Sequence, residues 1–168
     1  MKRKQINAQG EIQLLSEWLA ALPRTYSWKT HVHVGEQPLA YLGAQLTPAQ
    51  QRAFGVWSDW ADARVWTGGE VWIVEAKLVA TGSAYGQLID YLDEYPSSAD
   101  YAVFAPAPVK GVVLAQAARP RTSTLFAARG IETVIYQPSW PVREALQKVF
   151  PAAQILQPGV SGEGEIAG

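Results

Sequence analysis

The sequence predicts an α/β protein in which a mixed β-sheet is flanked by helices. Two runs rich in Val, Trp and Ile, residues 61–66 and 71–76, flank a Gly-Gly turn, which is a strong hairpin signal. Segments with helical spacing of apolar residues lie before and after this hairpin, and further apolar runs follow. The predicted order, αβββαβ followed by more α/β, is typical of a mixed sheet flanked by helices.

The elements before the hairpin are a helix, a strand and a short second helix. Residues 8–22 are predicted to be helical and to end at Pro23, and residues 26–34 alternate as a strand. Thr47 reads as a helix N-cap before a Pro at the first helical position, which predicts a short helix to about residue 54. The segment 35–59 is long for a connection, so we interpret it as an insertion that shapes a groove or an oligomer contact.

The elements after the hairpin alternate between helices and strands. We expect a helix over 84–94, strands over 101–105 and 111–116, a helix over 122–129 that Gly130 stops, a strand over 131–136 and a helix over 141–150. The tail 157–168 is rich in Gly without an apolar period, which predicts disorder. Residues 1–156 are therefore expected to form one domain.

The turn also predicts which residues of the hairpin face each other. If Gly68 and Gly69 form the loop, Asp62 stands directly opposite Glu75. Their Cβ atoms would lie about 4.5–5.5 Å apart, where two carboxylates repel unless a positive charge lies between them. Side chains alternate along a strand, so Lys77 shares the face of Glu75. Two carboxylates suit Mg²⁺, and the ammonium could hold an attacking water or offset charge on a phosphate.

The helix after the hairpin carries a polar pair beside its apolar stripe. Gln87 and Tyr91 lie one turn apart, next to the stripe of Leu88, Leu92 and Tyr95. A Gln and a Tyr at this spacing could reach one phosphate together.

These residues carry a resemblance to a known family. Asp62, the strand 71–74 running into Glu75-Ala76-Lys77, and the helix Gly86-Gln87-Leu88-Ile89-Asp90-Tyr91 resemble the PD-(D/E)XK nuclease superfamily, particularly its RecB-like and Holliday junction resolvase-like branch with a Gln-x-x-x-Tyr helix. The resemblance covers about residues 8–137, and it departs from the pattern at Ala61, where the motif has Pro.

The resemblance implies a restriction-endonuclease-like core that cuts DNA with Mg²⁺ or Mn²⁺. It implies that Asp62 and Glu75 bind the metal and that Lys77 assists the water. Gln87 and Tyr91 would line the site near the scissile phosphate.

Many members of this superfamily supply a further acidic residue from a helix near the N-terminus. The resemblance offers Glu11 and Glu17 for this position. We favour Glu11 as a metal residue that acts through water or a second metal, because it lies at the start of the predicted helix; Glu17 is the alternative.

Simpler interpretations exist for each residue alone. Lys77 could bridge an acid on a solvated face, which contributes about 0–1 kcal/mol. Asp62 could be a solvent-facing hairpin residue, and Gln87 and Tyr91 could be a packed helix pair. Glu11 and Glu17 could be ordinary charges of a helix surface.

Two histidines and one further acid resemble a metal site only superficially. His31 and His33 share a face of the predicted strand, but no third ligand lies nearby in the sequence, and catalytic zinc generally needs three protein ligands. We interpret them as satisfied strand histidines, or one of them as a residue near the substrate. Asp59 is expected to face solvent.

Composition limits the classes of protein to which the chain can belong. With 168 residues and 48% hydrophobic residues it can bury one good core. It has no apolar run of bilayer length and no signal-peptide core, so we expect a cytoplasmic protein without a membrane partner. It has no Cys, which excludes disulfides, thiol ligands and a thiol nucleophile.

The charge balance bears on nucleic-acid binding. A net charge of −1 argues against holding long duplex DNA by charge alone. Candidate phosphate contacts are Lys2, Arg3, Lys4, Arg119, Arg121 and Arg129, although each also fits an ordinary solvated charge. Most of the seven Trp residues are expected in the core, and one or two near the site could stack on bases.

Taken together, the sequence predicts hydrolysis of DNA phosphodiester bonds by a metal-activated water. The alternative is an inactive nuclease-fold module that binds nucleic acid or a partner protein, and a third reading is an assembly protein with an incidental acidic hairpin. A homo-oligomer is possible, and endonuclease or exonuclease action and DNA or RNA as substrate stay open. A small domain without helicase motifs fits a phage, mobile-element or repair nuclease, by analogy of fold and size.

Overall fold

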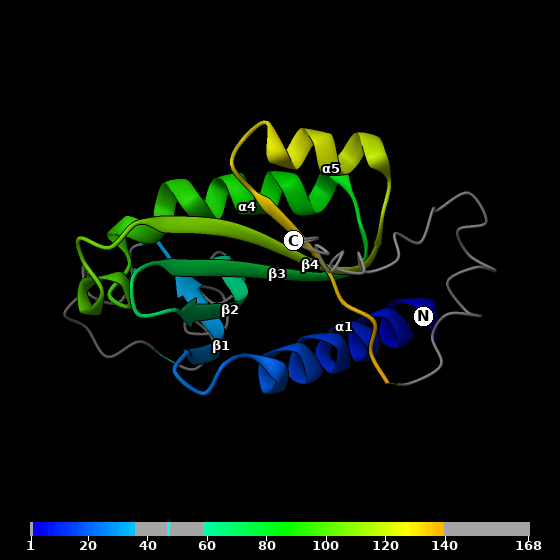
Figure 1. Cartoon of the computed structure of the whole chain (residues 1–168), viewed down its shortest axis with the longest axis horizontal. Coiled ribbons are helices and arrows are strands. Elements are labelled where there is room, and N and C mark those ends of the chain that lie inside the picture. The colour runs from blue at the N-terminus through cyan, green and yellow to red at the C-terminus, as the bar shows by residue number, and fades with distance from the viewer. Residues whose placement is uncertain (1, 36–46, 48–58, 140–168) are drawn as a thin grey trace, which may run out of the picture.

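The computed structural model describes residues 2–35, 47 and 59–139, with side chains from residue 9 onward within these ranges (Figure 1). The elements in chain order are α1 (Lys2–Ala21), β1 (Ser27–Val34), β2 (Asp59–Trp66), β3 (Val71–Ala80), α4 (Gly82–Glu94), the 3₁₀ helices η1 (Tyr95–Ser97) and η2 (Tyr101–Val103), β4 (Val109–Ala118), α5 (Pro120–Ala127) and β5 (Glu132–Ile135).

The strands form one five-stranded sheet in the order β1-β2-β3-β4-β5. The pairs β1–β2 and β2–β3 are antiparallel, whereas β3–β4 and β4–β5 are parallel. This confirms the predicted mixed sheet flanked by helices.

Helices cover both faces of the sheet (Figure 1). On one face Leu14 and Trp18 of α1 pack in a cluster with Val74 of β3, and on the other Leu88 of α4 and Phe126 of α5 belong to a second cluster. The central strands β3 and β4 are therefore buried on both sides, which explains why they read as nearly continuous apolar runs.

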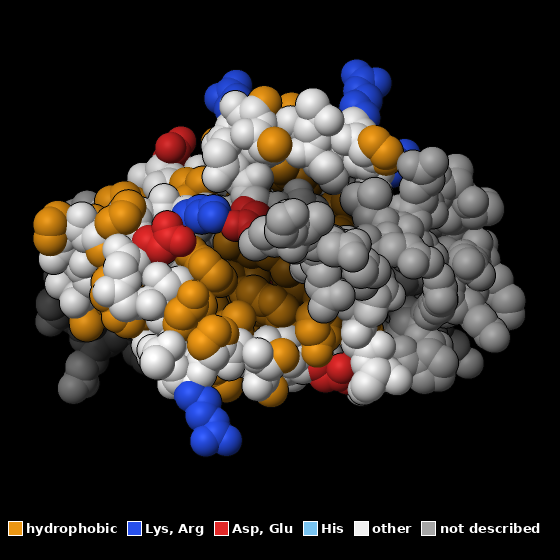
Figure 2. All heavy atoms as spheres, in the orientation of Figure 1, with side chains coloured by type: hydrophobic (Ala, Val, Ile, Leu, Met, Phe, Trp, Pro, Cys, Tyr) orange, Lys and Arg blue, Asp and Glu red, His pale blue; other side chains and the backbone are white. Residues whose placement is uncertain are grey.

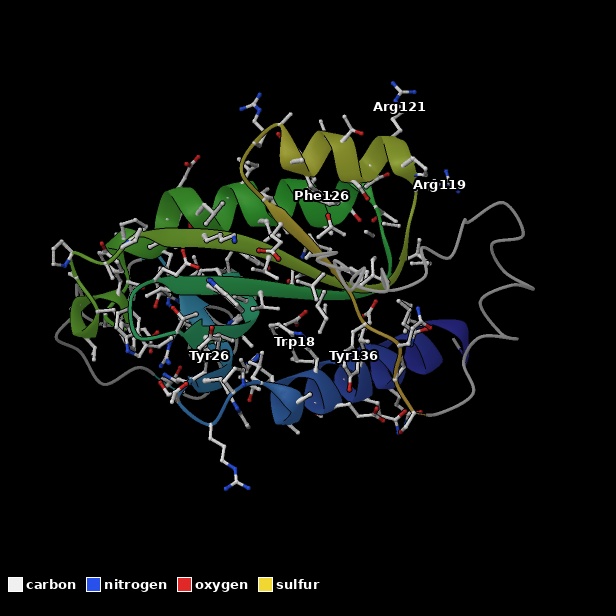
Figure 3. The ribbon with its side chains drawn as sticks, in the orientation of Figure 1. Trp18, Tyr26, Arg119, Arg121, Phe126 and Tyr136 are labelled. Carbon is white, nitrogen blue, oxygen red and sulfur yellow. The ribbon has the colours of Figure 1, made fainter. Side chains whose placement is uncertain are left out.

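Aromatic rings fill the α1 side of the sheet. Trp18 and Trp72 stack with their centroids 6.5 Å apart, and Tyr26 meets Trp72 edge-on at 5.7 Å. Figure 3 shows Trp18, Tyr26 and Tyr136 in the space between α1 and the strands, and Figure 2 shows apolar side chains at the surface of this region. The expectation of Trp residues in the core is confirmed for Trp18, which is 6% exposed.

The predicted hairpin register is confirmed. The ladder runs from Trp66 opposite Val71 to Ala63 opposite Val74, and Thr67 N–H donates to Glu70 O at 3.1 Å across the turn. Gly68 has φ of +99°, a conformation that favours glycine and fits the first central position of a type II′ turn.

The predicted strand over 101–105 is wrong. This segment forms η2, Val103 is 77% exposed, and the strand of the sheet begins only at Val109. The Tyr101 hydroxyl donates to Ala107 O at 3.2 Å, which holds the segment in a compact turn. A short apolar run cannot by itself separate a strand from a helical turn, and the prolines at 106 and 108 have no N–H for a sheet ladder.

The remaining differences concern element ends. The first helix begins before residue 8, β3 and β4 extend beyond the predicted strands, and α5 begins at Pro120, whose fixed φ suits the first helical turn. Gly130, with φ of +70°, follows the end of α5 as predicted. The residues outside the described ranges include most of the predicted insertion 35–59, the predicted helices after Thr47 and over 141–150, the tail 157–168, Trp57 and Trp140.

Within the described ranges, none of the helices is long and apolar enough to cross a membrane.

Candidate functional site

The candidate site lies where β3 loses its partner on one side. The described ladder with β2 ends at Val74, whereas β3 continues to Ala80 and stays paired with β4. From Glu75 onward, the part of the chain that the structure describes contains no strand partner for β3 on the β2 side. Backbone and side chains at this edge can therefore meet polar groups from other elements.

The Asp62 side chain accepts a backbone hydrogen bond from β3 just past the end of the β2–β3 ladder. Its Oδ2 accepts the Ala76 N–H at 2.8 Å. At this point the strand changes its facing: Ala63 packs in the cluster on the α1 side, whereas Ala61 packs in the cluster on the α4 side. The predicted pairing of Asp62 with Glu75 lies one step past the last pair of the ladder, Ala63 with Val74, and the Asp62 side chain bonds to the β3 backbone beside Glu75.

Glu75 and Lys77 form an ion pair at this edge. Lys77 Nζ lies 2.5 Å from Glu75 Oε1, and their side chains are 23% and 3% exposed. Burial raises the pKa of Glu75 to about 7, and the Asp62 carboxylate adds to the rise. Burial also raises the pKa of Asp62. Burial lowers the pKa of Lys77, but its hydrogen bond to Glu75 and the charges of Glu75, Glu11 and Asp62 together outweigh this and leave the pKa raised.

Glu11 reaches this cluster from α1. Burial raises its pKa, while the charge of Lys77 and a hydrogen bond with the Leu78 backbone oppose the rise, and the Asp62 charge adds to it. Glu11 and Asp62 also line a pocket of about 220 Å³ together with Ile12 and Leu15. Four predicted residues from three elements therefore lie together.

Glu17 has a different partner. Its carboxylate accepts the Ser139 N–H at 2.9 Å and the Ser139 hydroxyl at 3.0 Å. Of the two candidate acids on α1, the structure brings Glu11 to the cluster and ties Glu17 to the segment after β5.

The Gln87–Tyr91 pair lies on α4 with Tyr91 inside and Gln87 outside. The Tyr91 hydroxyl donates to Trp60 O at 3.0 Å, and Gln87 Nε2 lies 3.5 Å from that hydroxyl. Burial raises the pKa of Tyr91, and the charges of Glu75 and Asp62 raise it further. Tyr91 is therefore buried close enough to both carboxylates for their charges to affect its pKa, whereas the Gln87 side chain is exposed to solvent.

The histidines flank this site on β1. His31 stacks on Trp60 with centroids 4.2 Å apart, His33 meets the same ring edge-on at 5.2 Å, and the His31 charge lowers the pKa of Asp62. Asp59 is exposed, as predicted. Trp60 was not among the predicted site residues, although its place two residues before Asp62 was an available signal.

The predicted basic contacts are only partly described. Arg119, Arg121 and Arg129 are exposed, and Figure 3 shows Arg119 and Arg121 extending outward near the start of α5. The side chains of Lys2, Arg3 and Lys4 lie outside the described set.

The carboxylates at this edge can be compared with the ligands that a divalent metal prefers. Among the described residues, no group of three or more His, Asp or Glu side chains lies close enough to hold a metal ion. Asp62 and Glu75 nevertheless suit Mg²⁺, because this ion uses one or two carboxylates and completes its shell with water and substrate oxygens. Burial raises the pKa of both carboxyls, and the Asp62 charge adds to the rise at Glu75, so a cation beside them would favour their ionised forms.

Comparison with known proteins gives no relative: no protein-family model, curated protein or solved structure matches the chain.

Proposed function

We propose that this protein is a metal-dependent nuclease with a restriction-endonuclease-like core that hydrolyses DNA phosphodiester bonds. The observation that carries the proposal is the grouping of Asp62, Glu75, Lys77 and Glu11 at the β3 edge. The order α1, β1, β2, β3, α4, β4 also fits the αβββαβ core expected from the resemblance.

The chemistry of the residues supports a division of roles. Asp62 and Glu75 would hold Mg²⁺ or Mn²⁺, with Glu11 acting through water or a second ion. When bound, the metal would lower the pKa of a water and neutralise charge on the phosphate. The Lys77 ammonium would orient that water or stabilise the pentacovalent phosphate, because its raised pKa keeps it protonated.

The pair on α4 has a positioning role in this scheme. Tyr91 fixes the backbone of Trp60 through its hydroxyl, and the Gln87 amide, which is exposed beside that hydroxyl, can contact a phosphate oxygen. The buried Tyr91 hydroxyl has a raised pKa, so it acts as a neutral hydrogen-bonding group and not as a base.

The test is a cleavage panel with purified protein. Single-stranded, nicked, duplex and four-way DNA are incubated with Mg²⁺ or Mn²⁺ beside Lys77→Ala. We expect wild type to cut at least one substrate and Lys77→Ala to lose roughly 100-fold or more in rate, the usual effect of removing one group that stabilises transition-state charge. Product lengths separate exonuclease from endonuclease action.

A matched control comes from the same sheet. Lys110 of β4 also pairs with a glutamate, Glu132, but this pair is more exposed, at 34% and 45%. Lys110→Ala should therefore keep the wild-type cleavage rate. If no DNA is cut with either metal and Asp62→Asn leaves metal affinity unchanged, the enzyme proposal fails and the binding module becomes the better reading.

A further inference from the structure

An aromatic stack lies on the surface beside the candidate site. The rings of Trp60 and His31 are nearly parallel, with an angle of 6° and centroids 4.2 Å apart, and His33 meets Trp60 at 87°. Trp60 is 36% exposed and His31 is also exposed, so the stack presents ring surface to solvent. These two ring contacts hold Trp60 in place, so the ring surface that is exposed is fixed before a ligand binds.

The stack is tied to the carboxylates by the fold. Trp60 precedes Asp62 by two residues, and His31 stands opposite Asp62 in the register that pairs Thr30 with Ala63 and Val32 with Ala61. Its φ of +53° interrupts the ladder at this position. The Tyr91 hydroxyl also bonds to Trp60 O, so the stack and the site share one anchor.

The stack lies close to the site along β2. Trp60 and Asp62 are two residues apart, a backbone span of about 7 Å in a strand. A base on the stack would therefore belong to a nucleotide near a phosphate bound at Asp62.

We propose that Trp60 and His31 form a stacking platform for an unpaired base next to the scissile phosphate. The proposal rests on the nuclease function and deepens it by naming single-stranded or locally opened DNA as the substrate class. Stacking on aromatic rings is the usual source of affinity for unpaired bases, since in a duplex both faces of a base are already covered. A net charge of −1 gives such contacts more weight, because the chain has no excess of Lys and Arg over Asp and Glu to bind phosphates.

The experiment separates binding from cutting. Fluorescence anisotropy of a labelled single-stranded oligonucleotide, and of the blunt duplex of the same sequence, is measured with EDTA for wild type and Trp60→Ala. We expect the single-stranded affinity to fall about tenfold or more and the duplex affinity to stay within about twofold. Trp60→Phe, which keeps a ring, should lie between the two proteins.

Two further variants separate stacking on the platform from other effects of the substitution. His31→Asn removes the ring but tolerates the left-handed backbone, so it should weaken single-stranded binding in the same direction without unfolding the strand. Trp28→Ala is the matched control. Trp28 lies on β1, the strand that also carries His31, and is 49% exposed, but it has no ring contact in the described part of the chain. It should bind as wild type does.

The outcomes distinguish the platform from the nuclease. The platform is overturned if wild type binds no single-stranded DNA, if Trp60→Ala weakens both DNA forms equally, or if Trp28→Ala gives the same loss. If wild type cuts DNA and Trp60→Ala binds single strands unchanged, the nuclease stands without the platform. If wild type cuts nothing but Trp60→Ala loses single-stranded affinity, the platform stands as a binding site and the nuclease proposal fails.

Discussion

Replacing Asp100 should destabilise the protein because it leaves a buried cation without its partner. Arg64 Nε donates to Asp100 Oδ2 at 3.1 Å, and the two side chains are 10% and 14% exposed. The Arg64 guanidinium lies 4.4 Å from the Phe104 ring centroid, and the Tyr95 hydroxyl donates to Asp100 at 2.8 Å. Removing one member of a buried ion pair costs about 3–5 kcal/mol.

We expect Asp100→Asn to lower the free energy of unfolding by about 3 kcal/mol, at the lower end of that range because Asn keeps an acceptor oxygen. Urea denaturation at pH 7 measures the change. Lys29→Met is the control: Lys29 lies 3.4 Å from Asp100 but its side chain is 56% exposed, so its loss should cost less than about 1 kcal/mol.

A double-mutant cycle gives the coupling. Arg64→Met combined with Asp100→Asn should cost less than the two single changes together by more than about 1 kcal/mol, because neither charge is then left alone. Equal costs for Asp100→Asn and Lys29→Met, or an additive cycle, would refute the reasoning.

The pH dependence gives a second readout of the same pair. Burial opposes ionisation of Asp100, but hydrogen bonds from Arg64 and Tyr95 hold its pKa below the usual 3.8. A pKa that is lower in the folded than in the unfolded state contributes stability that is present above the unfolded pKa and is lost as the pH falls. The difference between wild type and Asp100→Asn should therefore shrink below about pH 4.

Two further predictions concern the site and the core. If Mg²⁺ binds at Glu75 as proposed, it would displace a proton there, because the pKa of Glu75 is raised to about 7. The Mg²⁺ affinity should then rise as the pH increases from about 6 to 8 and level off above that. Calorimetry in two buffers measures the proton release, and an affinity independent of pH would contradict the prediction. Gly111→Ala should cost about 1–3 kcal/mol, since a Cβ would lie 3.0 Å from Leu92 and 3.2 Å from Ile131. Gly86→Ala on α4 is the control: a Cβ there meets nothing within 4 Å, so the urea midpoint should stay unchanged or rise. If the Gly111→Ala variant is as stable as wild type, the packing argument is wrong.

The hairpin and its register were determined by local chemistry. A Gly-Gly turn allows few backbone conformations, and strand alternation then fixes every pair along the ladder, so Ala63 opposite Val74 follows from the sequence. The same local signals gave the helices and the buried strands. They failed at residues 101–105, where an apolar run without a partner strand became η2.

The choice between Glu11 and Glu17 needed tertiary structure. Six residues apart, they point from different faces of a helix with 3.6 residues per turn, but the sequence does not say which face meets the sheet edge. Packing of Leu14 and Trp18 on the sheet fixes the rotation of α1 and brings Glu11 to Asp62.

The sequence by itself thus determined the turn, the strand register and the residue types of the site. Only the tertiary structure decided that β3 continues beyond its last pair with β2 and that Asp62 bonds to the unpaired backbone there. It also decided that Trp60 stacks on His31. The physical reason is range: turns and periodicity depend on neighbouring residues, whereas the site and the stack depend on where segments distant in the sequence come to pack.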